Sequence, residues 1–244
     1  METELTRTAA KAVFMKAFGA QLEAYGFREQ ASGRGLYEYV HTAPGGARYV
    51  FKGTFTRQGD FHPLLQVYYP EVTAFIGTVA PWIAERAGTA VFSTHFTDFL
   101  DADNSDGYLH STGPHPYHPI PAPLTEPRMR QWAAELAAAW LPTALVPVLE
   151  RTGSLEAAEA LLNAENPVKP PRYRFAGSQR WMNSVLTRYV PVHFIMGLVL
   201  AHLLRRRNLP ELRDGAANYL RRNRQVDNEL FDLLQKVVDA TAEG

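Results

Sequence analysis

The spacing of apolar residues changes along the chain, and this change limits the possible folds more than any other feature. In residues 4–25 apolar side chains recur at steps of three and four, as in a helix with one buried face, and Gly26 follows as a stop signal. The next segments alternate with a period of two and are separated by turn residues, which predicts strands over residues 36–41, 47–56 and 64–69. We therefore expect a helix followed by an antiparallel β-meander with one buried face.

The rest of the chain is expected to add one more strand and several helices. A fourth strand over residues 90–99 follows a helical segment, residues 72–86, that Pro81 kinks or divides. From Thr125 onward helical spacing returns, with Thr125 as a cap and Pro142 as an interruption of the first helix. Further helices are expected over residues 154–164, 191–207 and 225–241.

The pattern as a whole predicts an α+β protein, in which an N-terminal helix and an antiparallel β-meander pack against a mainly α-helical C-terminal half. The two parts meet at a long loop, residues 101–123, that is rich in Pro, His, Gly and Asp. An α+β portion, residues 1–123, and a helical portion, residues 124–244, form either two domains or one continuous domain. The aromatic residues expected to be mostly buried are Phe51, Phe55, Trp132 and Trp140.

Positive charge is concentrated in one part of a chain whose formal net charge is zero. Between Lys169 and Arg224, twelve Lys or Arg stand against two acids, a formal charge of +10 that the rest of the chain balances. Such segregation is tolerated best where the basic surface binds an acidic protein face, a phosphate backbone or lipid head groups. A solvated surface neutralised by neighbouring acidic helix faces is the alternative. The arginines expected to contact a partner are Arg172, Arg174, Arg205, Arg206, Arg207, Arg221, Arg222 and Arg224.

Part of the basic segment also has aromatic residues between its arginines, as in Arg172-Tyr173-Arg174-Phe175. Guanidinium groups bind phosphates and aromatic rings stack on bases, so this pattern suits nucleic acid. The same alternation occurs at the rim of amphipathic helices. A nucleic-acid-associated protein that uses residues 169–224 is therefore an alternative function.

The loop contains three histidines within nine residues, His110, His115 and His118, and His95 lies on the preceding expected strand. Such imidazoles could ligate zinc and leave a position for water, so a metal-dependent hydrolase is a second alternative. The spacing follows no established ligand pattern and the loop has no glutamate to act as a base. We therefore expect a solvated loop and no bound metal or other cofactor. The acidic run that begins at Asp101 is expected to be an ordinary turn, because its spacing does not fit a calcium loop.

Catalytic and targeting signatures are missing from the sequence. It has no nucleophile elbow, P-loop, HExxH sequence or dinucleotide-binding glycine pattern, and no cysteine, so a non-catalytic protein is favoured. The acidic N-terminus lacks the basic flank and apolar core of a signal peptide, which favours a cytoplasmic location. The longest apolar run, residues 189–204, is shorter than the roughly 20 residues that span a bilayer, so no membrane span is expected.

The N-terminal region resembles a known group of small bacterial proteins. A helix ending in Leu22-Glu23-Ala24-Tyr25-Gly26-Phe27 is followed by Leu36-Tyr37-Glu38-Tyr39 and by a meander through Tyr49-Val50-Phe51 and Leu65-Gln66-Val67-Tyr68. This arrangement is similar to the α+β immunity proteins encoded beside polymorphic toxins, and the resemblance covers roughly residues 14 to 69. It implies a protein that binds and neutralises a cognate toxin or effector. Together with the charge pattern, it favours a protein partner with an acidic face.

Overall fold

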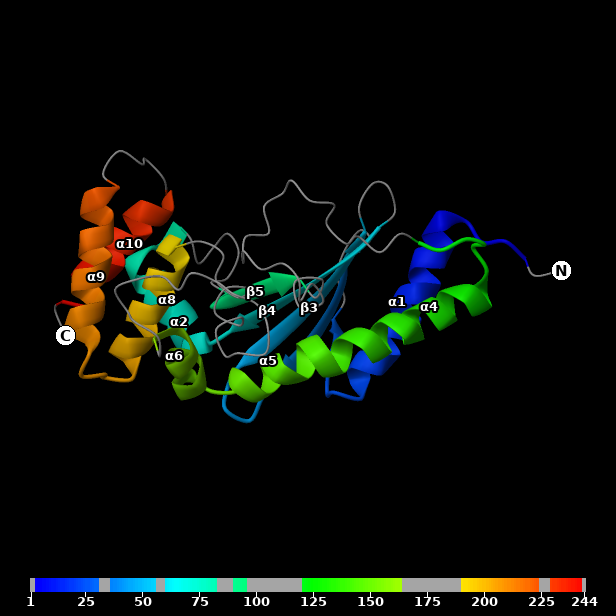
Figure 1. The fold of residues 1–244 in the computed structure, drawn as a ribbon, viewed down its shortest axis with the longest axis horizontal. Helices are drawn as coiled ribbons and strands as arrows, with labels where there is room; N and C mark the ends of the chain where they lie inside the picture. The colour runs from blue at the N-terminus through cyan, green and yellow to red at the C-terminus, as the bar shows by residue number, and fades with distance from the viewer. Residues whose placement is uncertain are drawn as a thin grey trace.

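The structure of the 244-residue chain is a computed structural model, and it describes residues 3–30, 36–55, 60–82, 90–95, 120–163, 190–223 and 229–242. Within these ranges the chain is α+β, as predicted (Figure 1). The strands are β1 (Arg28–Gln30), β2 (Tyr37–Thr42), β3 (Arg48–Phe55), β4 (Phe61–Tyr68) and β5 (Phe92–His95). The helical elements are α1 (Arg7–Glu23), α2 (Pro70–Val79), α4 (Glu126–Trp140), η2 (Leu141–Leu145), α5 (Val146–Arg151), α6 (Leu155–Asn163), α8 (Val190–Leu203), α9 (Leu209–Arg222) and α10 (Glu229–Ala240).

The five strands form one antiparallel sheet in the order β1-β2-β3-β4-β5. Its register pairs Tyr39 with Phe51 and Phe51 with Leu65, so these three side chains share one face, and all three are buried. The opposite face carries polar side chains, among them Glu38 and Lys52, whose charged groups lie 3.5 Å apart across β2 and β3. The alternation predicted for the meander is therefore confirmed, and it separates a core face from a polar face.

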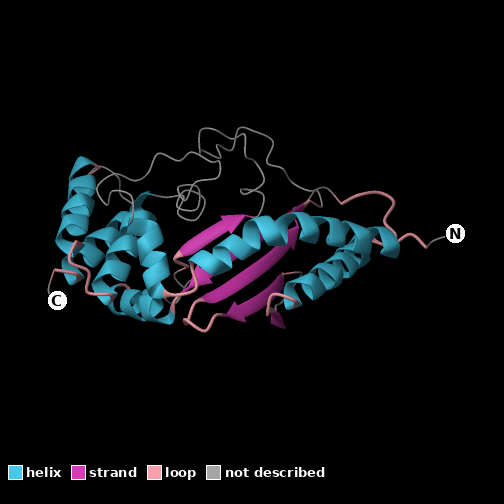
Figure 2. Cartoon of the chain, turned by 60° about the horizontal axis from the view of Figure 1, so that its bottom comes forward, coloured by secondary structure: helices cyan, strands magenta, loops and turns pink. Residues whose placement is uncertain are grey.

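Helices α1 and α4 lie side by side across the buried face of the sheet (Figure 2). Aromatic rings fill the space between these layers, and the rings of Phe61 and Trp140 stack with their centroids 5.9 Å apart. Phe51 and Trp140 have no exposed surface and Trp132 has 6%, which confirms the predicted core positions. Phe55, near the end of β3, is only half-buried.

Helix α1 has a capped start and a glycine stop. The Thr6 hydroxyl accepts a hydrogen bond of 3.2 Å from a backbone N–H of the first turn, and Gly26, with φ of +83°, follows the last turn. In the middle of the helix, an ideal Cβ on Gly19 would lie 2.1 Å from the Tyr39 hydroxyl oxygen. That hydroxyl donates a hydrogen bond of 3.1 Å to a backbone carbonyl of α1. Gly19 thus makes room for a tyrosine that joins the helix to β2.

The helix predicted to follow Thr125 runs further than expected. Pro142 does not end it, because α4 continues through the π-helical turn η2 into α5. In this turn the Val146 N–H bonds to the Leu141 carbonyl, five residues back, and the wider turn accommodates a proline that has no N–H to donate. Thr125 does occupy the N-cap position, but its side chain makes no capping hydrogen bond, so that part of the prediction was wrong.

The same helical stretch, Glu126–Arg151, is the one stretch of the described residues that is long and apolar enough to cross a bilayer by length and composition. Half of its most apolar window is buried inside the structure, where α4 packs on α1. The core helix of a soluble protein shows the same property, so this helix is no clear membrane span.

Helices α6, α8, α9 and α10 form a helical group that contacts α2, at the left of Figure 1. Helix α8 lies inside this group, where residues 193–201 are all buried. Burial lowers the pKa of His193 on this helix to about 4. The helix expected over residues 191–207 ends at Leu203, and α9 follows it as a separate helix that the sequence did not predict. The expected last helix is α10, and the buried hydrophobic residues of both halves belong to one cluster.

Candidate functional site

The structure places the predicted partner-binding arginines in two separate groups. Arg205, Arg206 and Arg207 lie in the turn between α8 and α9, here called the turn cluster, and Arg221 and Arg222 lie in the last turn of α9, here called the terminal pair. The two groups lie at opposite ends of α9 (Figure 1). At about 1.5 Å per residue, the 14-residue helix separates them by about 21 Å. Arg172, Arg174 and Arg224 lie outside the described residues.

The turn cluster begins with an unusual backbone conformation. Helix α8 closes with two hydrogen bonds, from the Arg205 N–H to the His202 carbonyl at 3.0 Å and from the Arg206 N–H to the Ala201 carbonyl at 2.9 Å. This pattern is a Schellman motif, whose central residue adopts a left-handed conformation and is usually glycine. Here the residue is Arg205, with φ of +51°. A side chain in this conformation costs about 1 to 2 kcal/mol relative to a right-handed one.

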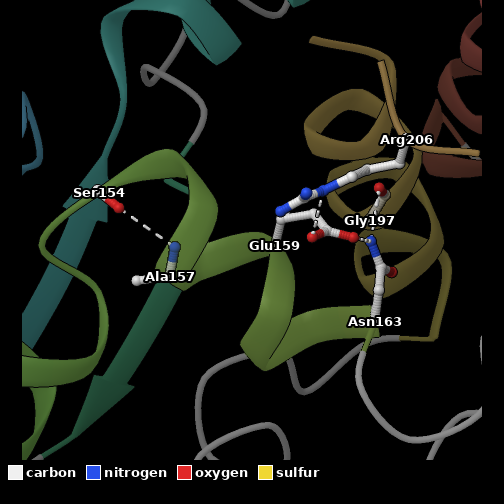
Figure 3. Close-up of polar contacts among 6 residues, drawn as sticks. All are labelled: Ser154, Ala157, Glu159, Asn163, Gly197 and Arg206. Atoms are coloured by element: carbon white, nitrogen blue, oxygen red, sulfur yellow. Dashed lines mark hydrogen bonds and ion pairs between the residues drawn. The ribbon is translucent and has the colours of Figure 1, made fainter. Parts of the chain in front are cut away.

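Arg206 is held by a buried acidic residue of α6 (Figure 3). Its Nε lies 2.9 Å from Oε2 of Glu159, whose side chain is 8% exposed, whereas that of Arg206 is 40% exposed. The Asn163 amide donates to the other Glu159 oxygen at 3.0 Å and to the Gly197 carbonyl at 3.1 Å. This network connects α6, α8 and the turn, and it satisfies a carboxylate that would otherwise be buried without a charged partner. Arg206 is therefore an internal anchor rather than a free binding group.

Two local features, one on α6 and one on α8, support the contacts of this network. The Ser154 hydroxyl accepts a hydrogen bond of 3.2 Å from the Ala157 N–H and caps α6, which was predicted as a helix over residues 154–164 (Figure 3). On the facing helix, an ideal Cβ on Gly197 would lie only 2.7 Å from the side-chain oxygen of Asn163. Gly197 therefore lets the amide approach the backbone of α8.

Arg205 and Arg207, on either side of this anchor, are both exposed. Within the part of the chain that the structure describes, neither side chain forms a hydrogen bond or an ion pair. The turn lies between the C-terminus of α8 and the N-terminus of α9, so the two helix dipoles act on these charges with opposite signs. Among the described residues, no acidic side chain is paired with either guanidinium group.

The terminal pair has a partly structural explanation. Arg221 and Arg222 are exposed in the last turn of α9, where cations favour the negative end of the helix dipole. Arg221 donates a hydrogen bond to the side chain of Asn218, one turn earlier. A groove of about 340 Å³ lies beside the pair between α9 and α10, and its walls are formed by Ala217, Leu220, Arg221, Asn223, Phe231, Asp232 and Gln235.

The residues considered as metal ligands are not brought together in what the structure describes. His110, His115 and His118 and the acidic run from Asp101 fall outside the described ranges. His95 lies in β5. Among the described residues no group of three or more His, Cys, Asp or Glu is placed to hold a metal ion. The expectation of an ordinary loop without metal stays a prediction.

Sequence reasoning missed the residues that hold Arg206. Glu159 and Asn163 are four residues apart on α6 and lie on its buried face with Ala158 and Leu162. Polar residues at apolar positions of a helical pattern were the available signal, because buried carboxylates are paired. The partner of Glu159 lies 47 residues away in the sequence, and no local pattern identifies it.

The chain matches no family model, no curated protein and no solved structure.

Proposed function

We propose that the protein is a non-catalytic binding protein of the immunity type, which neutralises a cognate bacterial toxin or effector in the cytoplasm. The observation that supports this most directly is the state of the arginines around α9. Four of them, Arg205, Arg207, Arg221 and Arg222, are exposed and form no ion pair with the described residues, while Arg206 is paired with Glu159. A protein that exposes unpaired positive charge in one region is suited to a partner with an acidic face.

The fold is consistent with this proposal. An N-terminal helix followed by an antiparallel meander is the arrangement on which the resemblance to immunity proteins rests. Fold alone does not imply function, so the weight of the proposal lies on the charged surface. Complementary charges raise the rate of encounter and disfavour wrong partners, which an inhibitor of one toxin requires.

Co-expression tests the immunity role directly. The gene that neighbours the coding sequence is expressed in a bacterial host with and without this protein, and growth is measured. We expect the neighbouring product to stop growth alone and the present chain to restore it, with the two proteins eluting together from a sizing column. A neighbouring product that is harmless alone, or that the chain neither binds nor neutralises, would remove the basis of the immunity assignment.

Charge reversal tests the contribution of the basic region to binding that partner. Changing Arg221, Arg222 and Arg224 to Glu should lower the association rate and flatten its salt dependence, because steering depends on long-range charge. The control reverses two charges, Arg7 and Lys16, which are exposed on α1 at the other end of the molecule (Figure 1), and it is compared with reversal of Arg221 and Arg222 alone. The control should bind with an unchanged rate, and circular dichroism should show that all the variants are folded.

The unpaired guanidinium groups also suit phosphates, so nucleic acid is the second candidate. Labelled DNA and RNA are titrated with the protein at about 50 and about 200 mM salt, since affinity for a phosphate backbone falls steeply over this range. We expect no binding at either concentration. Micromolar or tighter binding at the lower salt that is lost at the higher would favour the nucleic-acid role over the immunity role.

A further inference from the structure

We propose that Arg205 and Arg207 form the docking point for the partner, and that the partner presents clustered carboxylates on the surface of a folded protein. This inference rests on the proposed function, since it names the part of the basic region that makes the decisive contact. Three observations carry it: the backbone conformation of Arg205, the anchoring of Arg206, and the exposure of both flanking arginines.

The backbone at Arg205 is the first observation. The position is the left-handed residue of a Schellman motif, where glycine fits without strain and a side chain does not. An arginine therefore weakens the fold slightly at this position, and its exposed side chain gains nothing from the described residues in return. Strained backbone conformations that persist in proteins cluster at active sites, ligand-binding segments and switch regions. Contact between a partner and the guanidinium group of Arg205 would explain why an arginine occupies this position.

The anchor is the second observation. Arg206 is fixed through its ion pair with Glu159, which Asn163 supports from the same helix (Figure 3). The backbone that carries Arg205 and Arg207 is therefore held on both sides of the anchor before any partner arrives. A docking surface whose backbone is already ordered loses less conformational entropy on binding.

Exposed acids along α9 distinguish between the two classes of anionic partner. Glu211 and Asp214 are exposed on the helix between the turn cluster and the terminal pair. A phosphate backbone that follows α9 from one arginine group to the other would run along a helix that exposes these two carboxylates. A local group of carboxylates on a folded protein needs only the turn, where the planar guanidinium groups of Arg205 and Arg207 can each bind a carboxylate in a bidentate manner.

The test uses the full chain and a fluorescein-labelled tetraglutamate peptide as the probe, with binding followed by fluorescence anisotropy at low salt. At about 3.5 Å per residue, this peptide is too short to reach both arginine groups. The variant Arg205→Gly/Arg207→Ala removes both guanidinium groups and keeps the turn, because glycine favours the left-handed conformation. We expect its dissociation constant for the probe to rise by about tenfold. Its melting temperature should be unchanged or higher by a few degrees, which a loss of structure cannot produce.

The matched control is Arg7→Ala/Lys16→Ala, which removes two exposed positive charges from α1. We expect it to bind the probe within about twofold of the unaltered protein, because screened charges at that distance contribute little. Equal weakening by both double variants, no weakening by the turn variant, or a lowered melting temperature of the turn variant would overturn the inference. It would also be overturned if the unaltered protein does not bind the peptide or binds a labelled DNA duplex more tightly. None of these results affects the growth rescue, which tests the proposed function separately.

Discussion

Replacing Arg206 by Met is expected to destabilise the protein by about 2 kcal/mol. The change keeps most of the apolar stem of the side chain and removes the charge that faces Glu159. Glu159 then stays buried with only the Asn163 amide as a donor from the described network. A buried carboxylate that loses its charged partner is strongly unfavourable, which sets the direction of the effect.

The magnitude follows from the exposure of the two partners. A hydrogen bond to a charged group contributes about 1.5 to 3 kcal/mol, and loss of one partner of a fully buried pair costs about 3 to 5 kcal/mol. The Arg206 side chain is 40% exposed, so solvent screens the pair and the expected loss lies near the lower end of these ranges. The variant Glu159→Gln should cost only about 1 kcal/mol, because Arg206 can be hydrated and the amide of the new residue can still hydrogen-bond to Asn163.

A double-mutant cycle in urea measures the interaction itself. The variant Glu159→Gln/Arg206→Met should lose about 2 kcal/mol rather than the sum of the single losses, which gives a coupling of about 1 kcal/mol. The dependence of stability on urea should be the same for all four proteins, as expected when only stability changes. Single variants that each lie within about 0.3 kcal/mol of the unaltered protein would show that this ion pair does not hold the turn.

Three further predictions concern the core, the pH dependence and the loop. Trp132→Ala should cost about 3 to 5 kcal/mol in chemical unfolding because the ring is buried between α1, α4 and the sheet, and an unaltered stability would contradict the packing of α4. Burial lowers the folded-state pKa of His193 from its ordinary value of 6.5 to about 4. The unfolded chain therefore takes up the proton first, and stability should fall, by up to about 3 kcal/mol, as pH drops from 6.5 to 4. His193→Gln should lose less stability over that interval, and equal pH profiles would exclude this histidine as the cause. Elemental analysis of the purified protein should find no stoichiometric metal, and about one tightly held ion that His115→Ala removes would instead support the hydrolase alternative.

Local patterns in the sequence predicted those parts of the fold that depend on neighbours along the chain. The alternation in β3 indicated which side chains face the core, because a strand places successive residues on opposite faces. Ser154 indicated a helix start, because its side chain can accept a hydrogen bond from a backbone N–H of the first turn. Gly26 indicated a helix end, because glycine adopts a positive φ without strain. At these positions the local structure is determined by residues only a few places away in the sequence.

The features that the sequence did not predict depend on contacts between distant residues or on residues in positions that they ordinarily disfavour. A proline ordinarily disrupts a helix, but at Pro142 the chain forms a wider turn whose apolar residues are buried in the core, and the helix continues. The boundary between α8 and α9 falls at Arg205, where a glycine would have indicated a stop and an arginine does not. The pairing of Arg206 with Glu159 joins residues far apart in sequence. The charge pattern alone therefore predicted the same partner-binding role for Arg206 as for Arg205 and Arg207.

This distinction among the three arginines of the turn cluster decides which charge reversals are informative. Reversing all three together, including Arg206→Glu, would place a second carboxylate against Glu159, which is almost fully buried. Two like charges at hydrogen-bonding distance disfavour the folded state, so the turn is expected to lose its structure and α6 its contact with α8. Loss of partner binding by such a variant would then report unfolding, whether or not the surface binds anything. Reversing only Arg205 and Arg207 should leave the urea midpoint nearly unchanged, and a reduced affinity of that folded variant would be attributable to the two exposed guanidinium groups.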